Sequence, residues 1–176
     1  TNRNLTINNT AAASTTYTMG IRIAAFASVI TSADNDIIRN CIINGSAAGL
    51  NASGNTSTSS SVNVSYGIYA GATGSSAPAT NTTPPSAISS TSTTLGSGGT
   101  LANLVIDNNA VNKCGRAIMV QGSSATVAAG LMITNNTIGN ATTGNVDNVY
   151  SYGIGAQGSS NGIIRGNTIL NVESYL

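Results

Sequence analysis

Ile133-Thr134-Asn135-Asn136-Thr137-Ile138 is the clearest copy of a six-residue pattern that decides the fold of this chain. The pattern is an isoleucine, two variable positions, a small polar residue, one more variable position and a second aliphatic residue. It returns at Ile106–Val111 and Ile164–Ile169, and in weaker form at Ile38–Ile43 and Ile7–Ala12. Strand-forming units that recur in this way and cannot bury an apolar face alone indicate a solenoid.

Alignment of the five copies without gaps assigns side chains to the inside or the outside. The first position predicts a core column, because it is isoleucine in every copy: Ile7, Ile38, Ile106, Ile133 and Ile164. The next two positions are mostly polar and are predicted to face water in a turn. The fourth position, which we call the ladder position, holds Thr10, Cys41, Asn109, Asn136 and Asn167.

A second set of matched positions follows each copy. It consists of a bulky residue, a small residue and an isoleucine, at Met19–Ile21, Tyr66–Ile68, Arg116–Ile118 and Tyr152–Ile154. Two different patterns that recur in the same order predict at least two short strands in each repeat, with turns between them.

With these two patterns the chain resembles the right-handed parallel β-helix of the pectate-lyase-like superfamily, whose repeats read much like Val-Xaa-Ile-Xaa-Xaa-Asn-Xaa-Ile. The resemblance covers residues 5–172 apart from two insertions. It implies an all-β fold of about five coils, in which Asn109, Asn136 and Asn167 point inward and hydrogen-bond from coil to coil. A buried amide needs partners for its donors and its acceptor, and stacked copies supply them. The alternative is that these asparagines lie on the surface in turns.

The spacing of the ladder position predicts one long insertion. Successive copies are 31, 68, 27 and 31 residues apart, and the gap of 68 represents either one coil with an insertion or two coils, one of them degenerate. We favour the insertion, because residues 72–100 contain all three prolines and almost no aliphatic pattern. Shorter polar loops are expected at 51–61 and 140–149. Residues 1–176 are therefore interpreted as a single β-helical segment with long loop insertions.

Neither end of the chain carries the pattern of a natural cap. A solenoid with open ends exposes unpaired backbone groups, which invite pairing with more chain. We therefore expect a segment of a longer protein, or a subunit that stacks on identical subunits.

Composition argues against several classes of function. Only 6% of the residues are charged, the formal net charge is +1, and histidine and tryptophan are absent. Without a basic stripe, nothing favours nucleic acid as a partner. The most apolar stretch, residues 21–30, is short and contains Arg22, which argues against membrane insertion.

The acidic residues form no recognisable catalytic set. Hydrolytic relatives in the superfamily use clustered aspartates, commonly with a histidine, whereas this chain has four scattered aspartates and one glutamate. Asp34 and Asp36 resemble a fragment of a calcium loop, and a turn before Ile37 explains them better. Arg39 and Asp107 share one repeat column, which predicts an exposed ion pair, with a saccharide-binding or catalytic role as the alternative. We assign no catalytic, metal-binding or cofactor-binding residue and expect no cofactor.

The tyrosines and cysteines offer further candidates. Tyr66, Tyr69, Tyr150 and Tyr152 are candidates for an aromatic surface that stacks on sugar rings, with packing at the start of a strand as the alternative. The two cysteines, Cys41 and Cys114, occupy different repeat positions, so buried free thiols are expected in preference to a disulfide.

These observations predict a non-catalytic structural or adhesive β-helix module, extracellular or on the cell surface, that pairs at its open ends with more of the same chain or with identical subunits. The sequence does not decide whether the chain is an enzyme, although the missing catalytic set favours a structural role. The alternative is a carbohydrate-binding or polysaccharide-degrading β-helix, either a lyase or a hydrolase. Ice binding ranks lower, because the column of Thr137 and Thr168 is interrupted by Ala11, Ile42 and Ala110.

Overall fold

The computed structural model describes residues 2–10, 17–26, 33–46, 64–73, 100–122, 128–142 and 147–172. In this part of the chain all regular structure is β-strand, and neighbouring strands run parallel. The predicted loop at 51–61 lies outside the described residues, as do residues 74–99 of the predicted insertion and residues 143–146 of the third loop. Ala72 and Thr73, which we assigned to the insertion, instead end a strand.

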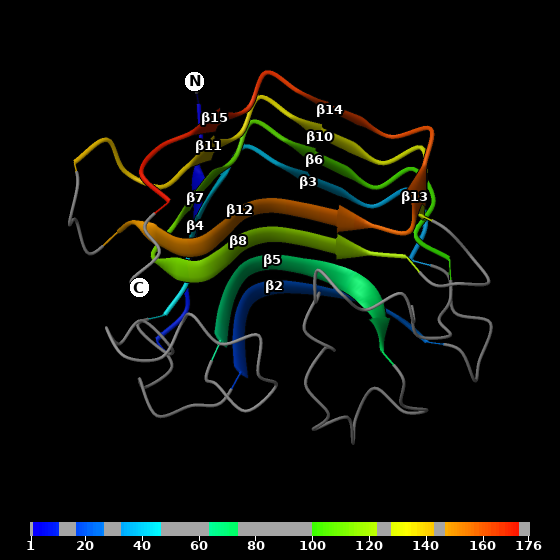
Figure 1. Cartoon of the computed structure of the whole chain (residues 1–176), viewed down its shortest axis with the longest axis horizontal. Coiled ribbons are helices and arrows are strands. Elements are labelled where there is room, and N and C mark those ends of the chain that lie inside the picture. The colour runs from blue at the N-terminus through cyan, green and yellow to red at the C-terminus, as the bar shows by residue number, and fades with distance from the viewer. Residues whose placement is uncertain are drawn as a thin grey trace.

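The described strands form three main sheets and one small one (Figure 1). Sheet A contains β1 (Leu5–Asn8), β4 (Cys41–Asn44), β7 (Ala110–Asn112), β11 (Thr137–Ile138) and β15 (Thr168–Ile169). Sheet B contains β2 (Tyr17–Phe26), β5 (Val64–Thr73), β8 (Cys114–Gln121) and β12 (Val149–Gln157). Sheet C contains β3 (Ile37–Arg39), β6 (Val105–Asp107), β10 (Met132–Thr134) and β14 (Ile163–Arg165). The small sheet pairs β9 (Ala128–Ala129) with β13 (Ser159–Ser160).

The chain visits the three main sheets repeatedly and in the same order. After β1 and β2, it passes through sheets C, A and B as β3–β4–β5, then as β6–β7–β8, then as β10–β11–β12, and it finishes with β14 and β15. We call each of these rounds a pass. Each pass adds one strand beside the strand of the previous pass, so side chains at equivalent repeat positions become neighbours.

The pass that contains Cys41 lies directly beside the pass that contains Asn109. Strand β4 pairs with β7, β3 with β6 and β5 with β8, although the two ladder residues are 68 positions apart. Cys41 and Asn109 therefore lie in neighbouring passes, with no pass of the described residues between them.

The registers confirm four of the five aligned copies and correct the first. In sheet C, Ile38, Ile106, Ile133 and Ile164 face one another, and in sheet B the Tyr-Gly-Ile-type positions match as aligned. Strand β1 instead sets Leu5 opposite Cys41 and Ile7 opposite Ile43. The prediction that Thr10 occupies the ladder position was wrong, and so was the place of Ile7 in the first column. Because β1 belongs to sheet A, its alternating side chains match the strand after the ladder turn.

The main core lies between the three sheets. Each sheet contributes alternate side chains to it, among them Ile43 and Val111 from sheet A, Ile68 and Ile118 from sheet B, and Ile106 from sheet C. All five of these side chains are fully buried. The buried residues are mostly isoleucine, valine, leucine and alanine, which pack well on a pleated surface.

A column of left-handed residues makes the turn between sheets C and A. Asn40, Asn108, Asn135 and Gly166 have φ angles of 60°, 52°, 56° and 65°. Asparagine and glycine adopt this conformation more readily than other residues, which explains their repetition immediately before the ladder position. The turn re-aims the chain, so that the next side chain points inward.

No helix in the described part of the chain is long and apolar enough to cross a membrane.

Candidate functional site

The asparagine ladder, formed by Asn109, Asn136 and Asn167, is the most regular polar feature inside the protein. The side-chain nitrogen Nδ2 of Asn109 donates to Oδ1 of Asn136 at 3.1 Å, and Nδ2 of Asn136 donates to Oδ1 of Asn167 at 2.9 Å. Asn109 and Asn136 are almost completely buried. The predicted inward ladder is confirmed over these three passes, and the alternative of surface asparagines is wrong.

Each ladder asparagine also bonds the backbone of the preceding pass. Oδ1 of Asn136 accepts the backbone N–H of Asn109 at 2.9 Å, and its Nδ2 donates to the carbonyl oxygen of Ile106 at 2.9 Å. Asn167 repeats both contacts, with Asn136 at 2.9 Å and with Ile133 at 2.8 Å. The ladder is therefore directional, because every asparagine satisfies buried polar groups of the pass before it.

Cys41 occupies the ladder position one pass before Asn109 and contacts the ladder only through its backbone N–H. Its N–H donates to Oδ1 of Asn109 at 3.0 Å, while its thiol donates to the carbonyl oxygen of Arg39 at 3.2 Å. Cys41 and Cys114 are both free and buried, as the sequence predicted. Burial raises the pKa of the Cys114 thiol to about 12.

The last pass, β14 and β15, forms an open edge of sheets C and A, which we call the C-terminal edge (Figure 1). Ile133 and Ile138 are fully buried in the preceding pass, whereas their partners Ile164 and Ile169 are 52% and 48% exposed. The core columns thus continue to this edge without a covering strand among the described residues. Burial of a large aliphatic side chain contributes about 1.5–3 kcal/mol, so a further strand layer on this edge would be stabilised by the two isoleucines.

The opposite edge, formed by β1, β2 and β3, has a different composition. Its ladder position holds Leu5, which is 57% exposed, in place of an amide. Arg3 lies close to this edge, and its side chain extends to two later passes. Its Nε donates to the carbonyl oxygen of Asn108 at 3.0 Å, and a terminal nitrogen donates to Oγ1 of Thr137 at 3.1 Å. The two edges therefore differ at the ladder position, although both expose aliphatic side chains.

The outer face of sheet C carries the predicted ion pair. Nε of Arg39 lies 3.0 Å from Oδ2 of Asp107. Oδ1 of Asp107 accepts hydrogen bonds from the Thr134 hydroxyl at 2.6 Å and from Nδ2 of Asn135 at 2.9 Å. These two hydrogen bonds, and then the charge of Arg39, hold the pKa of Asp107 below its usual value. All of these contacts of Asp107 have a structural role, because they join three neighbouring passes of the chain.

Sequence reasoning missed an apolar stripe on the same outer face. Each core isoleucine of sheet C is preceded by an aliphatic residue or methionine that points outward, and these four line up across the sheet: Ile37, Val105, Met132 and Ile163. Ile37 and Ile163, at the two ends of the stripe, are among the most exposed large hydrophobic side chains. The signal was present in the sequence as Ile-Ile, Val-Ile, Met-Ile and Ile-Ile pairs.

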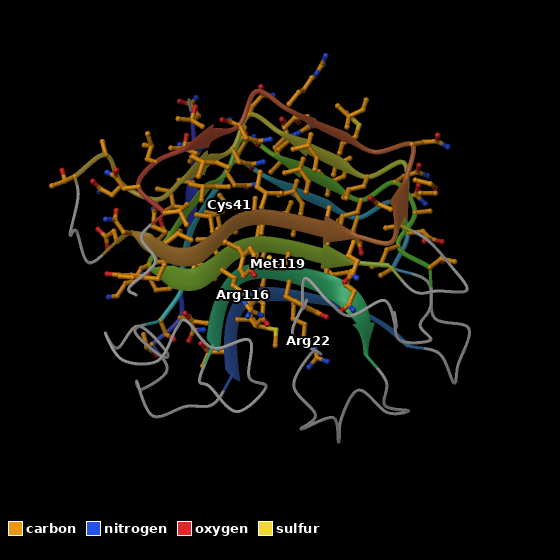
Figure 2. The ribbon with its side chains drawn as sticks, in the orientation of Figure 1. Arg22, Cys41, Arg116 and Met119 are labelled. Atoms are coloured by element: carbon orange, nitrogen blue, oxygen red, sulfur yellow. The ribbon has the colours of Figure 1, made fainter. Side chains whose placement is uncertain are left out.

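Arg116 lies at the centre of the tyrosine group on the outer face of sheet B. Its guanidinium carbon is 5.7 Å from the ring centre of Tyr66 and 5.3 Å from that of Tyr152, and one nitrogen donates to the Tyr66 hydroxyl at 3.0 Å. Such cation–π contacts attract the guanidinium group to the faces of both rings. Arg116 is only 7% exposed, and Figure 2 shows it beside Met119 along the strands of sheet B.

The predicted aromatic surface is mostly closed. Tyr66 and Tyr69 are fully buried and pack edge to face at 5.3 Å, and the Tyr69 hydroxyl donates to Oε1 of Gln121 at 3.0 Å. Burial raises the pKa of Tyr69. Tyr150 is also buried, which leaves Tyr152, at 39% exposure, as the accessible ring of the four. Tyr66 and Tyr69 thus match the alternative interpretation, in which they pack within the strand.

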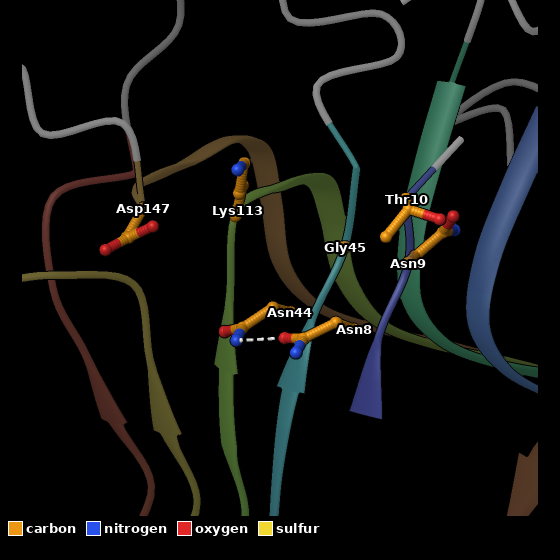
Figure 3. Close-up of a pocket in the computed structure, with 7 residues that line it drawn as sticks. All are labelled: Asn8, Asn9, Thr10, Asn44, Gly45, Lys113 and Asp147. Carbon is orange, nitrogen blue, oxygen red and sulfur yellow. Dashed lines mark hydrogen bonds between the residues drawn. The ribbon is translucent and has the colours of Figure 1, made fainter. Parts of the chain in front are cut away.

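A polar cleft of about 400 Å³ lies beside the ends of β1 and β4 (Figure 3). Its described lining is dominated by amides and includes one cation and one anion: Asn8, Asn9, Thr10, Asn44, Gly45, Lys113 and Asp147. Nδ2 of Asn44 donates to Oδ1 of Asn8 at 2.8 Å, which fixes one wall. These amide and charged groups offer hydrogen-bond donors and acceptors to the cleft.

Asp34 has a structural partner for each carboxylate oxygen. Oδ1 accepts the backbone N–H of Ala102 at 2.7 Å, and Oδ2 accepts the Thr100 hydroxyl at 2.8 Å. Asn35, which follows Asp34, has a φ angle of 64° and lies in a bend, which agrees with the predicted turn before Ile37. Among the described residues, no group of three or more histidine, cysteine, aspartate or glutamate side chains could hold a metal ion.

No protein-family model, curated protein or solved structure matches this chain. Its function must therefore be argued from its own residues.

Proposed function

We propose that this chain is a right-handed parallel β-helix of about five coils that serves as a non-catalytic structural or adhesive module, outside the cell or on its surface. Each pass through sheets C, A and B corresponds to one coil, and parallel strands joined by crossovers are right-handed in almost every known case. The relationship to the pectate-lyase-like superfamily is part of the same proposal and rests on the repeat pattern and its resemblance.

One observation carries the structural role. The directional ladder and the core isoleucine columns run through successive passes, and among the described strands none follows them at the C-terminal edge, where Ile164 and Ile169 are about half exposed. We infer that this edge docks a further parallel strand layer, which continues both columns. Exposed strand edges pair readily with other chains unless they are blocked.

The charged groups support a role without catalysis. Arg39 and Asp107 bond one another, and the carboxylate of Asp34 accepts hydrogen bonds from Thr100 and Ala102 of the neighbouring pass. General acid–base chemistry needs a pair of ionisable groups that face a common substrate. The described aspartates instead lie at separate places, in the turn before β3, at the end of β6 and beside the cleft.

Carbohydrate binding is the second candidate, and the polar cleft beside β1 and β4 favours it. Asparagine amides together with Lys113 and Asp147 offer donors and acceptors for sugar hydroxyls. Retention of the protein on immobilised neutral and acidic polysaccharides tests carbohydrate binding, and incubation with the same panel in solution tests polysaccharide degradation. The structural proposal predicts no new reducing ends and no unsaturated products, and the appearance of either product would contradict it.

Assembly is tested separately by negative-stain electron microscopy. End-to-end docking predicts elongated particles at high protein concentration, and Ile164→Asp at the C-terminal edge should shorten them. Short particles at every concentration would contradict docking between copies of this chain.

A further inference from the structure

We infer that Arg116 forms a binding site for an oxyanion, the carboxylate, sulfate or phosphate group of an acidic ligand, on the outer face of sheet B. The site consists of the Arg116 guanidinium group and the tyrosine rings that hold it. It lies on β8, between β5 and β12, and is independent of the docking proposed for the C-terminal edge.

Arg116 is a buried cation, and none of the four described aspartates lies beside it. Its side chain is 7% exposed. The aspartates lie before β3, at the end of β6 and beside the polar cleft. Glu173, the fifth acidic residue of the chain, lies outside the described residues. A buried charge costs free energy unless an opposite charge or hydrogen bonds compensate it, so Arg116 is suited to an anionic partner.

A single hydrogen bond joins the Arg116 side chain to the described residues. The guanidinium group has five N–H donors in a planar fork, and one terminal nitrogen donates to the Tyr66 hydroxyl at 3.0 Å. The ring faces of Tyr66 and Tyr152 attract the positive charge but supply no oxygen acceptor for the other donors. These donors match the two oxygens that a carboxylate, sulfate or phosphate group presents to an arginine.

The guanidinium group is held in place before any ligand arrives. Arg116 lies opposite Tyr66 on one neighbouring strand and opposite Tyr152 on the other. Tyr66 packs edge to face against Tyr69, whose hydroxyl donates to Gln121, and both rings are fully buried. A group that is already fixed by its neighbours loses little conformational freedom on binding, which favours affinity.

The surroundings of Arg116 strengthen its attraction for an anion. Tyr66, Tyr69 and Met119 form a small buried apolar cluster on this face, and Figure 2 shows Met119 beside Arg116. Electrostatic attraction is stronger in such a medium than in water. Tyr152, whose ring contacts the guanidinium group, is 39% exposed, so solvent reaches one wall of the site.

The test uses isothermal titration calorimetry of the full chain with three probes at constant ionic strength. Sulfate represents a free anion, glucose 6-sulfate represents an acidic group on a sugar, and glucose is the neutral control. Arg116→Gln removes the charge, and Arg116→Lys keeps the charge but not the planar fork. Arg165→Gln, at an exposed arginine of sheet C, is the matched control for the loss of one positive charge. Circular dichroism confirms that each variant is folded.

We expect the wild type and Arg165→Gln to bind both sulfated probes with equal affinity and to ignore glucose. Binding should be lost with Arg116→Gln and weakened about ten-fold with Arg116→Lys, because the bidentate contact is lost. If Arg116→Gln does not fold, Arg116→Lys carries the comparison. A higher affinity for glucose 6-sulfate than for sulfate would support the site and identify an acidic sugar as the source of the anion, whereas equal affinities would support a site for the anion alone.

Three results would overturn this assignment. The first is an absence of binding heat with both sulfated probes in the wild type. The second is equal binding by the wild type and both Arg116 variants, which would place the anion elsewhere and leave Arg116 a purely structural role. The third is binding that appears only in Glu173→Gln, which would show that a carboxylate of this chain, and not a separate ligand, is the partner of Arg116.

Discussion

The side-chain nitrogen of Asn136 lies 2.9 Å from the side-chain oxygen of Asn167, 31 residues further along the chain. This contact and its counterpart between Asn109 and Asn136 join three passes of the chain through a row of buried amides. Buried polar groups stabilise a fold only when their partners are present, and each partner here is the next copy of the same residue.

Replacement of Asn136 by leucine should strongly destabilise the protein. The variant removes the acceptor for two Asn109 donors and the donor to the carbonyl oxygen of Ile106. Each buried group that loses its partner costs about 1–3 kcal/mol. Urea denaturation measures the loss, and Asn4→Leu, at an exposed asparagine, serves as the matched control. Equal stability of the two variants would mean that the ladder position is exposed to water.

Cys41→Asn should be tolerated, because Cys41 already occupies the ladder position opposite Asn109. An amide there gains a side-chain hydrogen bond to Asn109, and we expect a change in unfolding free energy within about 1 kcal/mol. The reverse exchange, Asn109→Cys, removes bonds to two neighbouring passes and should cost about 1–3 kcal/mol for each group left unpaired. Thermal unfolding of both variants checks the order, and a larger loss with Cys41→Asn would contradict it.

Gly67→Ala should destabilise the packing between sheets A and B. A Cβ at Gly67 would overlap Cγ1 of Val111 and lie 2.8 Å from the carbonyl oxygen of Ala117. Extra atoms in a well-packed core cost about 1–3 kcal/mol. Gly162→Ala is the control, because its nearest neighbour would be the Leu131 carbonyl oxygen at 3.4 Å. Differential scanning calorimetry should give a lower melting temperature for the first variant only, and unchanged melting of both would contradict close packing around Gly67.

The lowered pKa of Asp107 predicts that the stability of the protein depends on pH. Its pKa in the folded protein lies below the ordinary carboxyl value of 3.8, so ionised Asp107 stabilises the folded state above that value. This contribution is lost as the pH falls from 3.8 toward the lower pKa. Asp107→Asn should therefore be less stable than the wild type at pH 7, and the difference should vanish in strong acid. A difference that stays constant from pH 7 to pH 2 would show that the charge of Asp107 contributes nothing.

The repeat pattern was sufficient to predict most of the fold. Isoleucine at the first position identified the core column, because an aliphatic side chain is stabilised by burial. Asparagine three residues later identified the inward ladder, because a buried amide needs hydrogen-bond partners and the same residue in the next pass supplies them. The bulky-small-isoleucine positions of sheet B were also matched correctly. Ladder asparagines are a strong signal, since they repeat with the same neighbours in three passes.

The first strand could not be aligned from sequence, because β1 has a neighbour on one side only and no asparagine at its ladder position. Leu5 and Ile7 both fit the alternation of a strand. The sequence alone therefore does not decide whether β1 pairs with a strand of sheet C or with a strand of sheet A. With the corrected register, Thr6 joins the threonine column of Thr137 and Thr168, which Ile42 and Ala110 still interrupt.

The candidate sites were predicted less well than the fold. The ion pair of Arg39 and Asp107 follows from a shared column, but the cation–π contacts of Arg116 depend on which rings lie beside it across sheet B. The polar cleft combines the ends of β1 and β4 with Lys113 and Asp147, which are far apart in sequence. Local patterns carry no information on such combinations.

The stacking of passes is tested most directly by a disulfide between Thr137 and Thr168, which face each other on adjacent parallel strands. Strands in a sheet lie about 4.8 Å apart, within the range of Cα separations that a disulfide spans. Thr137→Cys combined with Thr168→Cys should form the bridge under mild oxidation, and peptide mapping by mass spectrometry should locate it. The control combines Thr134→Cys with Thr168→Cys, whose residues lie in different sheets. The account predicts a bridge in the first pair only, whereas free thiols at 137 and 168, or equal bridging of the control pair, would contradict it.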